Sequence, residues 1–474
     1  MTEFLDPLDG AFILLEVAGS SMNIGAVVEL EPGDFDANTR FELIRATVAA
    51  RVHEIPVFTK RVVRAPLDMT WPILVPDERI DLDRHVIRAA VPGPGTDEQF
   101  DVLVSDFFSR ALNPRRPLWQ LLVIEGLSEG RSALVLKVHH ALADGVSGAE
   151  AFANLFDISP EIRAPAPAVE TPQDDTVTSS FGLLAQGLRR IRTRPAIVLE
   201  SLTSWSARLY RAVRAFVIVT LSHAARRSGD EQPSIFEARR TSLNGAPGVE
   251  KEFHRLRLPL ADVKRAAKSR GASVTDFVMA TSSGALRRLL EHRGETARRD
   301  LVAFVPINVR DETSAQLGNQ ISGKLIRLHT ELTDPLERLD AIVKDSAAAA
   351  GRRRADNEKV LQSIPRVLGP MALSIGAKLV SLTGVVSWMP PIANVMISSV
   401  PGPPISLWLS GLRVVSAAPV GPLVGSFSLN VTVLGFGESL EFGLLGCALQ
   451  MPDLELLRDL LVEEANQLIN ATPR

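Results

Sequence analysis

The sequence of 474 residues has little of several features that define other protein classes. Its single cysteine, Cys447, excludes an intramolecular disulfide and favours a reducing compartment. The formal net charge of −3 lacks the basic excess of nucleic-acid-binding proteins. The N-terminus contains Glu3 and Asp6, where a secretory signal would be basic. We therefore expect a cytoplasmic protein that binds no nucleic acid.

Long hydrophobic runs are also missing. The longest uncharged stretch, residues 379–412, is long enough to cross a bilayer, but prolines at 390–391 and 401–404 interrupt it, and a helix followed by a strand in a protein core is predicted instead. No cluster with metal-ligand spacing and no glycine-rich phosphate loop is present, so we expect no metal and no resident cofactor. With 46% hydrophobic residues, the chain can form two globular domains.

Prolines, alanines and acids dominate residues 158–178, which is typical of a linker. Residues 181–227 are helical in pattern and carry nine arginines against one acid, Glu200. A basic amphipathic segment of this kind either lies on an anionic lipid surface or packs on the protein with its basic face in water. We predict three parts: an N-terminal domain (1–160), this linker and basic segment (161–232), and a C-terminal domain (233–474).

Hydrophobic alternation and capping signals predict the elements. A hairpin is predicted from strands 120–126 and 132–139, which would place Trp119 and His140 at neighbouring heights. Further strands are predicted at 22–30, 57–64, 253–258, 302–309, 325–332, 393–400 and 426–433, and helices at 38–53, 96–112, 147–156, 260–269, 275–291 and 452–469.

The most specific pattern is His139-His140, three residues, and Asp144-Gly145, between a predicted strand and a capped helix. A neutral imidazole can take the proton of an alcohol that attacks an acyl group. Asp144 follows across a turn, where it can accept a hydrogen bond from the ring or pair with an arginine. The alternative is a strand edge and an Asp-Gly turn without chemistry.

This HHxxxDG pattern resembles the acyltransferase superfamily that includes chloramphenicol acetyltransferase and condensation domains. Nearly the whole chain is similar to the bacterial bifunctional wax ester synthase/acyl-CoA:diacylglycerol acyltransferases. The other matching stretches are Leu8–Phe12, Met22–Gly25, Pro117-Leu118-Trp119, Thr275-Asp276, Pro306–Arg310, Gly318-Asn319, Asn394 and Ser398–Pro403.

The resemblance implies an α/β fold of two chloramphenicol-acetyltransferase-like domains, each a mixed sheet flanked by helices, with a tunnel between them. It implies acyl transfer from acyl-CoA, as co-substrate, to diacylglycerol or a fatty alcohol at a membrane or lipid-droplet surface. His140 would be the general base, His139 would orient the loop, and Asp144 would pair with Arg61 or Arg310. Residues expected to bind substrate or shape the site are Gly145, Pro117, Leu118, Trp119, Asp276, Asn394, Ser398 and Asn430.

The chain departs from the family pattern at Thr275, Ser399 and Cys447. Three alternatives therefore stay open. The first is a related acyltransferase that uses another alcohol or amine, or a carrier-bound donor. The second is a weakly active or silent lipid-droplet protein, against which the intact HHxxxDG pattern argues. The third is an interaction protein that uses the basic segment and has no need of the histidines.

Overall fold

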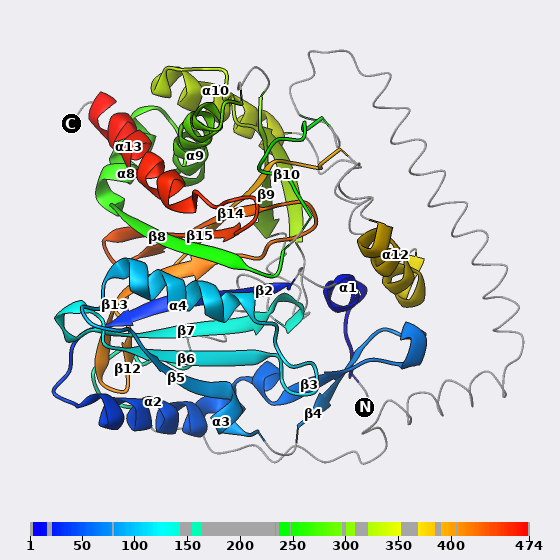
Figure 1. Cartoon of the computed structure of the whole chain (residues 1–474). Coiled ribbons are helices and arrows are strands. Elements are labelled where there is room, and N and C mark those ends of the chain that lie inside the picture. The colour runs from blue at the N-terminus through cyan, green and yellow to red at the C-terminus, as the bar shows by residue number, and fades with distance from the viewer. Residues whose placement is uncertain are drawn as a thin grey trace, which may run out of the picture.

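The computed structural model describes residues 3–16, 21–77, 80–142, 154–163, 233, 237–246, 248–295, 300–308, 321–351, 368–383, 390–403 and 405–472. Two six-stranded mixed sheets form its centre (Figure 1). The first runs in the order β12 (Trp408–Leu409), β13 (Leu412–Val420), β2 (Asn23–Leu30), β7 (Ser132–His139), β6 (Trp119–Glu125), β5 (Val86–Ala90). The second runs β10 (Ile321–Arg327), β9 (Val302–Asn308), β11 (Val395–Val400), β14 (Leu429–Phe436), β15 (Ser439–Cys447), β8 (Lys251–Pro259). A small sheet joins β1 (Glu3–Phe4), β4 (Ile73–Pro76) and β3 (Lys60–Val63).

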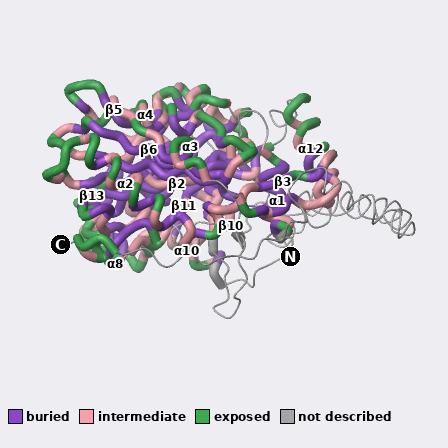
Figure 2. The backbone as a smooth tube through the Cα atoms, turned by 90° about the horizontal axis from the view of Figure 1, so that it is seen from below, coloured by how far each residue is buried: buried purple, intermediate pink, exposed green. Residues whose placement is uncertain are grey.

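Helices flank both sheets, as expected. The second sheet is covered by α8 (Leu260–Ser269), α9 (Val274–His292), α10 (Pro335–Gly351) and α13 (Leu454–Ala471). Beside the first sheet lie α2 (Ala37–Arg51) and α3 (Leu82–His85), while α4 (Asp97–Ser109) runs between the two sheets. Two further helices are α1 (Pro7–Leu15) and α12 (Pro370–Thr383). Buried residues lie along the sheets and exposed ones at the periphery (Figure 2).

Several elements begin where their capping residues predict. The Thr96 hydroxyl accepts a hydrogen bond from Gln99 N–H at 3.3 Å, and the Gln99 side chain accepts one from Thr96 N–H at 3.0 Å, so both halves of the predicted capping box form. Asp36 caps α2. The cap of α9 is Ser273 rather than Thr275. Local sequence therefore fixes these helix starts to within two residues.

Two predicted elements are wrong in position. The strand expected at 325–332 is β10, which ends at Arg327, and His329 then adopts a left-handed φ of 52°. The helix expected at 147–156 does not reach its predicted end, because residues 154–156 form a turn. The reason is the neighbouring bridge, in which Asp157 and Trp408 exchange backbone hydrogen bonds of 2.8 and 2.9 Å. The start of that helix lies outside the described residues.

One strand pair crosses between the two halves of the chain. β13 pairs antiparallel with β2 from Val414↔Leu30 to Val420↔Gly25. The preceding strand, β12, pairs with β13 at the edge of the same sheet. A segment of the predicted C-terminal domain thus forms the edge of the N-terminal sheet. The boundary at 160/161 adjoins residues that are not described, and the three-part division stays a prediction.

Charged side chains of α4, β2 and β8 join the two sheets. Glu29 on β2 pairs with Arg131 and with Arg255 on β8, and Arg255 also contacts Asp97 of α4 at 2.7 Å. Asp101, also on α4, is 3% exposed and lies 3.1 Å from His254 Nδ1. Burial raises the pKa of Asp101 to about 6, although His254 opposes the shift.

This carboxyl should make stability depend on pH. Between its ordinary pKa of 3.8 and about 6, the folded chain keeps a proton that the unfolded chain has lost. The free energy of unfolding should therefore fall as pH rises through this range, by on the order of 3 kcal/mol relative to Asp101→Asn. Urea unfolding of both proteins at several pH values tests this, and parallel profiles would contradict it.

Candidate active site

The predicted hairpin of β6 and β7 forms and brings the Pro-Leu-Trp and His-His stretches together. Trp119 pairs in register with Val138. The Leu118 carbonyl accepts the His139 N–H at 3.0 Å, and the Met22 carbonyl accepts the His140 N–H at 2.7 Å. Both histidines are thereby fixed at the backbone, at the end of β7 between β2 and β6.

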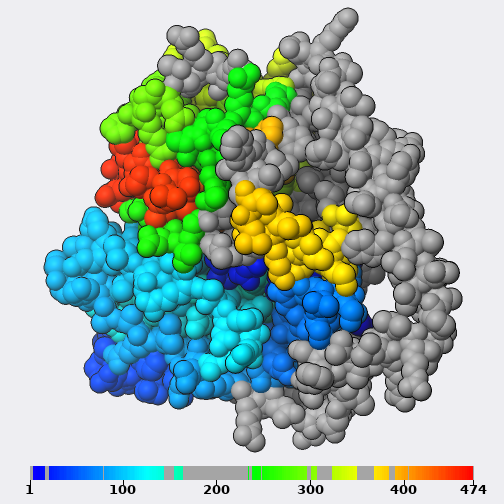
Figure 3. Space-filling view, turned by 45° about the vertical axis from the view of Figure 1, so that its right-hand side comes forward, coloured from blue at the N-terminus to red at the C-terminus, as the bar shows by residue number. Residues whose placement is uncertain are grey.

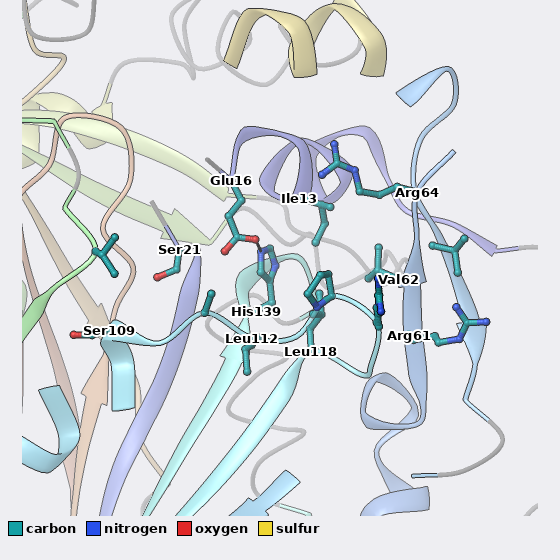
Figure 4. Close-up of a pocket in the computed structure, with 15 residues that line it drawn as sticks. Ile13, Glu16, Ser21, Arg61, Val62, Arg64, Ser109, Leu112, Leu118 and His139 are labelled. Atoms are coloured by element: carbon teal, nitrogen blue, oxygen red, sulfur yellow. Dashed lines mark ion pairs between the residues drawn. The ribbon is translucent and has the colours of Figure 1, made fainter. Parts of the chain in front are cut away.

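Both ring nitrogens of His139 face polar groups, but among the described residues only Nδ1 takes part in a hydrogen bond. Its side chain is 1% exposed, and Nδ1 accepts the Ala141 N–H at 3.1 Å. The ring proton is therefore assigned to Nε2. This nitrogen lies 3.4 Å from Oε2 of Glu16, the residue that follows α1 (Figure 4). A ring held in this way orients the turn and is poorly placed to accept a proton.

His140 begins the 3₁₀ turn η5 (His140–Leu142). It is 8% exposed, and its ring lies against Phe12 of α1 with centroids 4.6 Å apart and planes at 30°. The aromatic face restricts the orientation of the imidazole. Asp144 and Gly145 lie outside the described residues, so their predicted roles stay predictions.

A cavity of about 780 Å³ adjoins this turn (Figure 4). Its walls come from α1, β3, the segment after α4, the end of the hairpin and the segment before β8. The described lining includes His139, but His140, the next residue, is not part of it. The cavity lining includes Ile13, Glu16, Val63, Arg64, Leu118 and His139. Most of this wall belongs to the N-terminal half, with Val249 from the other half, and the tunnel between domains stays a prediction.

Leu118 lines the cavity, whereas Trp119 lies in the core beneath it. Trp119 is 0% exposed, donates Nε1–H to the Phe58 carbonyl at 2.9 Å, and stacks between Phe58 and His85. Pro117 is buried, and its carbonyl accepts the Trp119 N–H at 2.9 Å. Trp119 thus packs behind the end of the hairpin, and its predicted role in shaping the site stays a prediction.

The predicted site residues of the second half have partners within the protein. Asp276 closes the capping box of α9, with its carboxylate 2.8 Å from Ser273 N. Asn394 donates to the Arg239 carbonyl at 2.6 Å and accepts the Val302 N–H at 2.9 Å. A role for either at the site stays a prediction.

Asn430 and Ser398 lie on neighbouring strands of the second sheet. Asn430 donates to the Pro422 carbonyl at 2.9 Å and accepts the Thr432 hydroxyl at 2.6 Å. A Cβ at Gly421 would come within 2.4 Å of Asn430, so the chain passes close to this amide where β13 leaves the first sheet. Ser398 on β11 is half-buried and pairs with Thr432. Asn430 therefore secures the crossing between the sheets, and the predicted site role of both residues is untested.

Within the described part of the chain, one group has the spacing of metal ligands: Asp300, His329 and Glu331. Its members have internal partners, because His329 Nε2 lies 3.1 Å from Asp345 and Asp300 accepts the Thr330 N–H at 3.0 Å. The group acts as an ion cluster that ties the loop after β10 to α10.

Comparison with known proteins gives a consistent result. A family model described as wax ester synthase/diacylglycerol acyltransferase catalytic domain matches residues 5–278, and the corresponding C-terminal domain matches 317–469. The chain belongs to this family. Two relatives from Mycobacterium tuberculosis, both named "Putative diacyglycerol O-acyltransferase", are 29% and 30% identical over 99% and 95% of this chain and 91% and 96% of theirs.

Solved structures agree on the fold of this family member. A wax ester synthase/diacylglycerol acyltransferase from Marinobacter aquaeolei matches with a TM-score of 0.68, 24% identity and 98% coverage of both chains. The first condensation domain of the calcium-dependent antibiotic synthetase matches with a TM-score of 0.56 and 17% identity over 100% of this chain and 98% of that one. The predicted fold class and enzyme family are confirmed.

Glu16 lines the site, but the sequence pattern did not predict it as a site residue. It follows the last turn of α1, where an acid is ordinarily solvated, and no spacing links it to His139. Asn23, within the matching stretch Met22–Gly25, is a second polar residue at this place. It stands opposite His139 in register, and its buried amide has no hydrogen-bond partner among the described residues. This end of the β2–β7 pair is therefore more polar than the strand centres.

Replacing Glu16 with glutamine should lower kcat on the order of tenfold, because the variant keeps the size of the side chain but removes the charge that faces His139 Nε2. Steady-state acyl transfer measured across pH tests this. The control is Glu463→Gln, an exposed carboxylate on α13. Equal profiles for wild type and Glu16→Gln would show that the carboxylate does not orient the histidine.

Proposed function

We propose that this chain transfers a fatty acyl group from acyl-CoA to the hydroxyl of diacylglycerol, and also to long-chain alcohols. Family membership supports the reaction class. The observation that supports the assignment of the base is the state of His139, whose two nitrogens face the Ala141 N–H and Glu16. Of the adjacent pair, His140 is therefore the histidine to which we assign proton transfer.

The proposed step needs no acyl-enzyme. As the acceptor oxygen attacks the thioester carbonyl carbon, His140 takes the hydroxyl proton. A tetrahedral intermediate forms, its C–S bond breaks, and the departing sulfur receives the proton from the imidazolium. Ester and free CoA thiol are the products, and His140 returns to its neutral form. Phe12 holds the ring during both transfers.

Release of free CoA measures this reaction directly. With purified full-length chain, long-chain acyl-CoA should release CoA only when diacylglycerol or a fatty alcohol is present. A carrier-bound acyl donor with an amine acceptor should give no product. The opposite preference would assign the chain to the condensation-type alternative, and no turnover with either pair would favour the silent homologue.

We further propose that the protein works in the cytoplasm, peripherally attached to membrane or lipid droplets. Among the described helices, none has the length and apolar character needed to span a bilayer. The basic segment 181–227, which we propose contributes to attachment, lies outside the described residues. Vesicle binding that is unchanged after its arginines are neutralised would remove that segment from the proposal.

A further inference from the structure

The outer face of α12 is apolar where a surface helix is ordinarily polar. Ile375, Leu379 and Leu382 follow one another at helical spacing and are 50%, 55% and 84% exposed. The helix contains no acid, and its one charged residue, Lys378, is exposed beside them. The opposite face, with buried Leu373 and Ser374, packs on α1 and η3 (Pro66–Asp68). Figure 3 shows α12 in yellow at the surface, above the blue β3–β4 region.

A third exposed leucine, Leu67, lies in the turn that adjoins this helix. Leu67 in η3 is 80% exposed and has a left-handed φ of 56°, a conformation that is unfavourable for a leucine. The turn is held in place, because Arg64 donates two hydrogen bonds to Asp68, at 2.9 and 2.7 Å, and the Ser374 hydroxyl donates to Asp68 at 2.5 Å. Burial disfavours the charge, yet the bonds from Arg64 and Ser374 hold the pKa of Asp68 below its ordinary value. The carboxylate thus fixes Leu67 and α12 relative to each other.

The elements beneath this face also form the cavity wall. Ile13 on α1 and Glu16 just after it line the cavity from the side on which α12 packs, and Val63 and Arg64 line it immediately before η3 (Figure 4). Ile375, Leu379 and Leu382 on the outer face of α12, together with Leu67 in the turn that α12 contacts, are called the apolar patch. Packing within the described chain does not account for the exposure of these four side chains.

We propose that this apolar patch, with Lys378, docks on a lipid surface and so presents the cavity to acceptors dissolved in that lipid. The inference rests on the proposed function, since a diacylglycerol acceptor partitions into lipid. α12 carries a cation and no acid, although Lys378 also interacts electrostatically with Asp68 in η3, and a cation there complements anionic headgroups. Leucine and isoleucine side chains at helical spacing suit the acyl boundary beneath the headgroups. The patch is distinct from the basic segment 181–227.

Vesicle flotation with the full chain tests the docking. The probes are phosphatidylcholine vesicles with and without phosphatidylglycerol. The patch variant Ile375→Ser/Leu379→Ser/Leu382→Ser should lower the partition coefficient by at least about tenfold. Leu67→Ser alone should lower it less, and Lys378→Glu should weaken binding only to the anionic vesicles. A matched control, Val102→Ser/Ile158→Ser/Leu449→Ser, changes residues that are 66%, 75% and 78% exposed elsewhere and should leave binding unchanged.

Activity and size measurements separate the outcomes. With a water-soluble short-chain alcohol, the patch variant should release CoA at the wild-type rate, whereas its rate with vesicle-dispersed diacylglycerol should fall. Failure of the proposed function would appear as no acceptor-dependent release by wild type. Vesicle binding by the patch variant equal to wild type would overturn the docking proposal, as would a dimer that the same substitutions convert to monomer without loss of binding.

Discussion

Replacing His140 with alanine should lower kcat for acyl transfer by about 10²–10⁴-fold, the usual contribution of a well-placed general base. Alanine leaves the backbone hydrogen bond to Met22 intact and removes only the ring that lies against Phe12. Because the thioester can still bind in the variant, KM for acyl-CoA should change much less than kcat. Initial rates of CoA release at saturating acceptor measure both constants.

Two histidine variants make this result specific. His139→Ala should reduce kcat less than His140→Ala, since His139 orients the turn through the Ala141 N–H. His292→Ala replaces an exposed histidine on α9 and should have no effect. If His140→Ala keeps a kcat near that of wild type, the assignment of proton transfer to His140 is wrong. A larger loss in His139→Ala would reverse the two roles.

Trp119→Ala should destabilise the protein by about 3–5 kcal/mol, the range found when large buried aromatic residues are truncated. The substitution removes a fully buried ring from between Phe58 and His85, whose centroids lie 4.6 and 4.3 Å away. It also leaves the buried Phe58 carbonyl without its donor. Urea unfolding monitored by circular dichroism measures the change.

Trp119→Phe is the matched variant, because it keeps an aromatic ring in the stack and removes the Nε1–H donor. Its destabilisation should be nearer 1–3 kcal/mol, the cost of an unsatisfied buried acceptor. Below the unfolding transition, Trp119→Phe should keep most of its activity, since the residue supports Leu118 and His139 from the core. Full loss of activity in a stably folded Trp119→Phe protein would instead place the indole in the reaction.

The elements that the sequence predicted well are those that depend on near neighbours. The Thr96–Gln99 capping box, the β6–β7 hairpin and the consequent meeting of Leu118 with His139 follow from signals within a few residues. The family resemblance supplied what periodicity alone does not, namely two sheets of similar kind and the reaction class.

What the sequence could not predict depends on partners far along the chain. Nothing in residues 412–420 indicates pairing with β2 instead of with the strands of their own half, because an apolar strand suits either sheet edge. Glu16 reads as a solvated acid after a helix, and only the folded chain places it beside His139. The exposed leucines of α12 are indistinguishable from core residues until the packing face is known.

The pairing of β13 with β2 decides how this enzyme can be divided into fragments. A protein ending at residue 278, the limit of the catalytic-domain match, would contain β8, α8 and only the first five residues of α9, without the other strands of their sheet. It would also lack β13, leaving the backbone of β2 from Gly25 to Leu30 as an open edge, which favours aggregation. The two halves must therefore be made together, and co-expressed fragments would restore activity only if the C-terminal piece carries residues 408–420 to cover that edge.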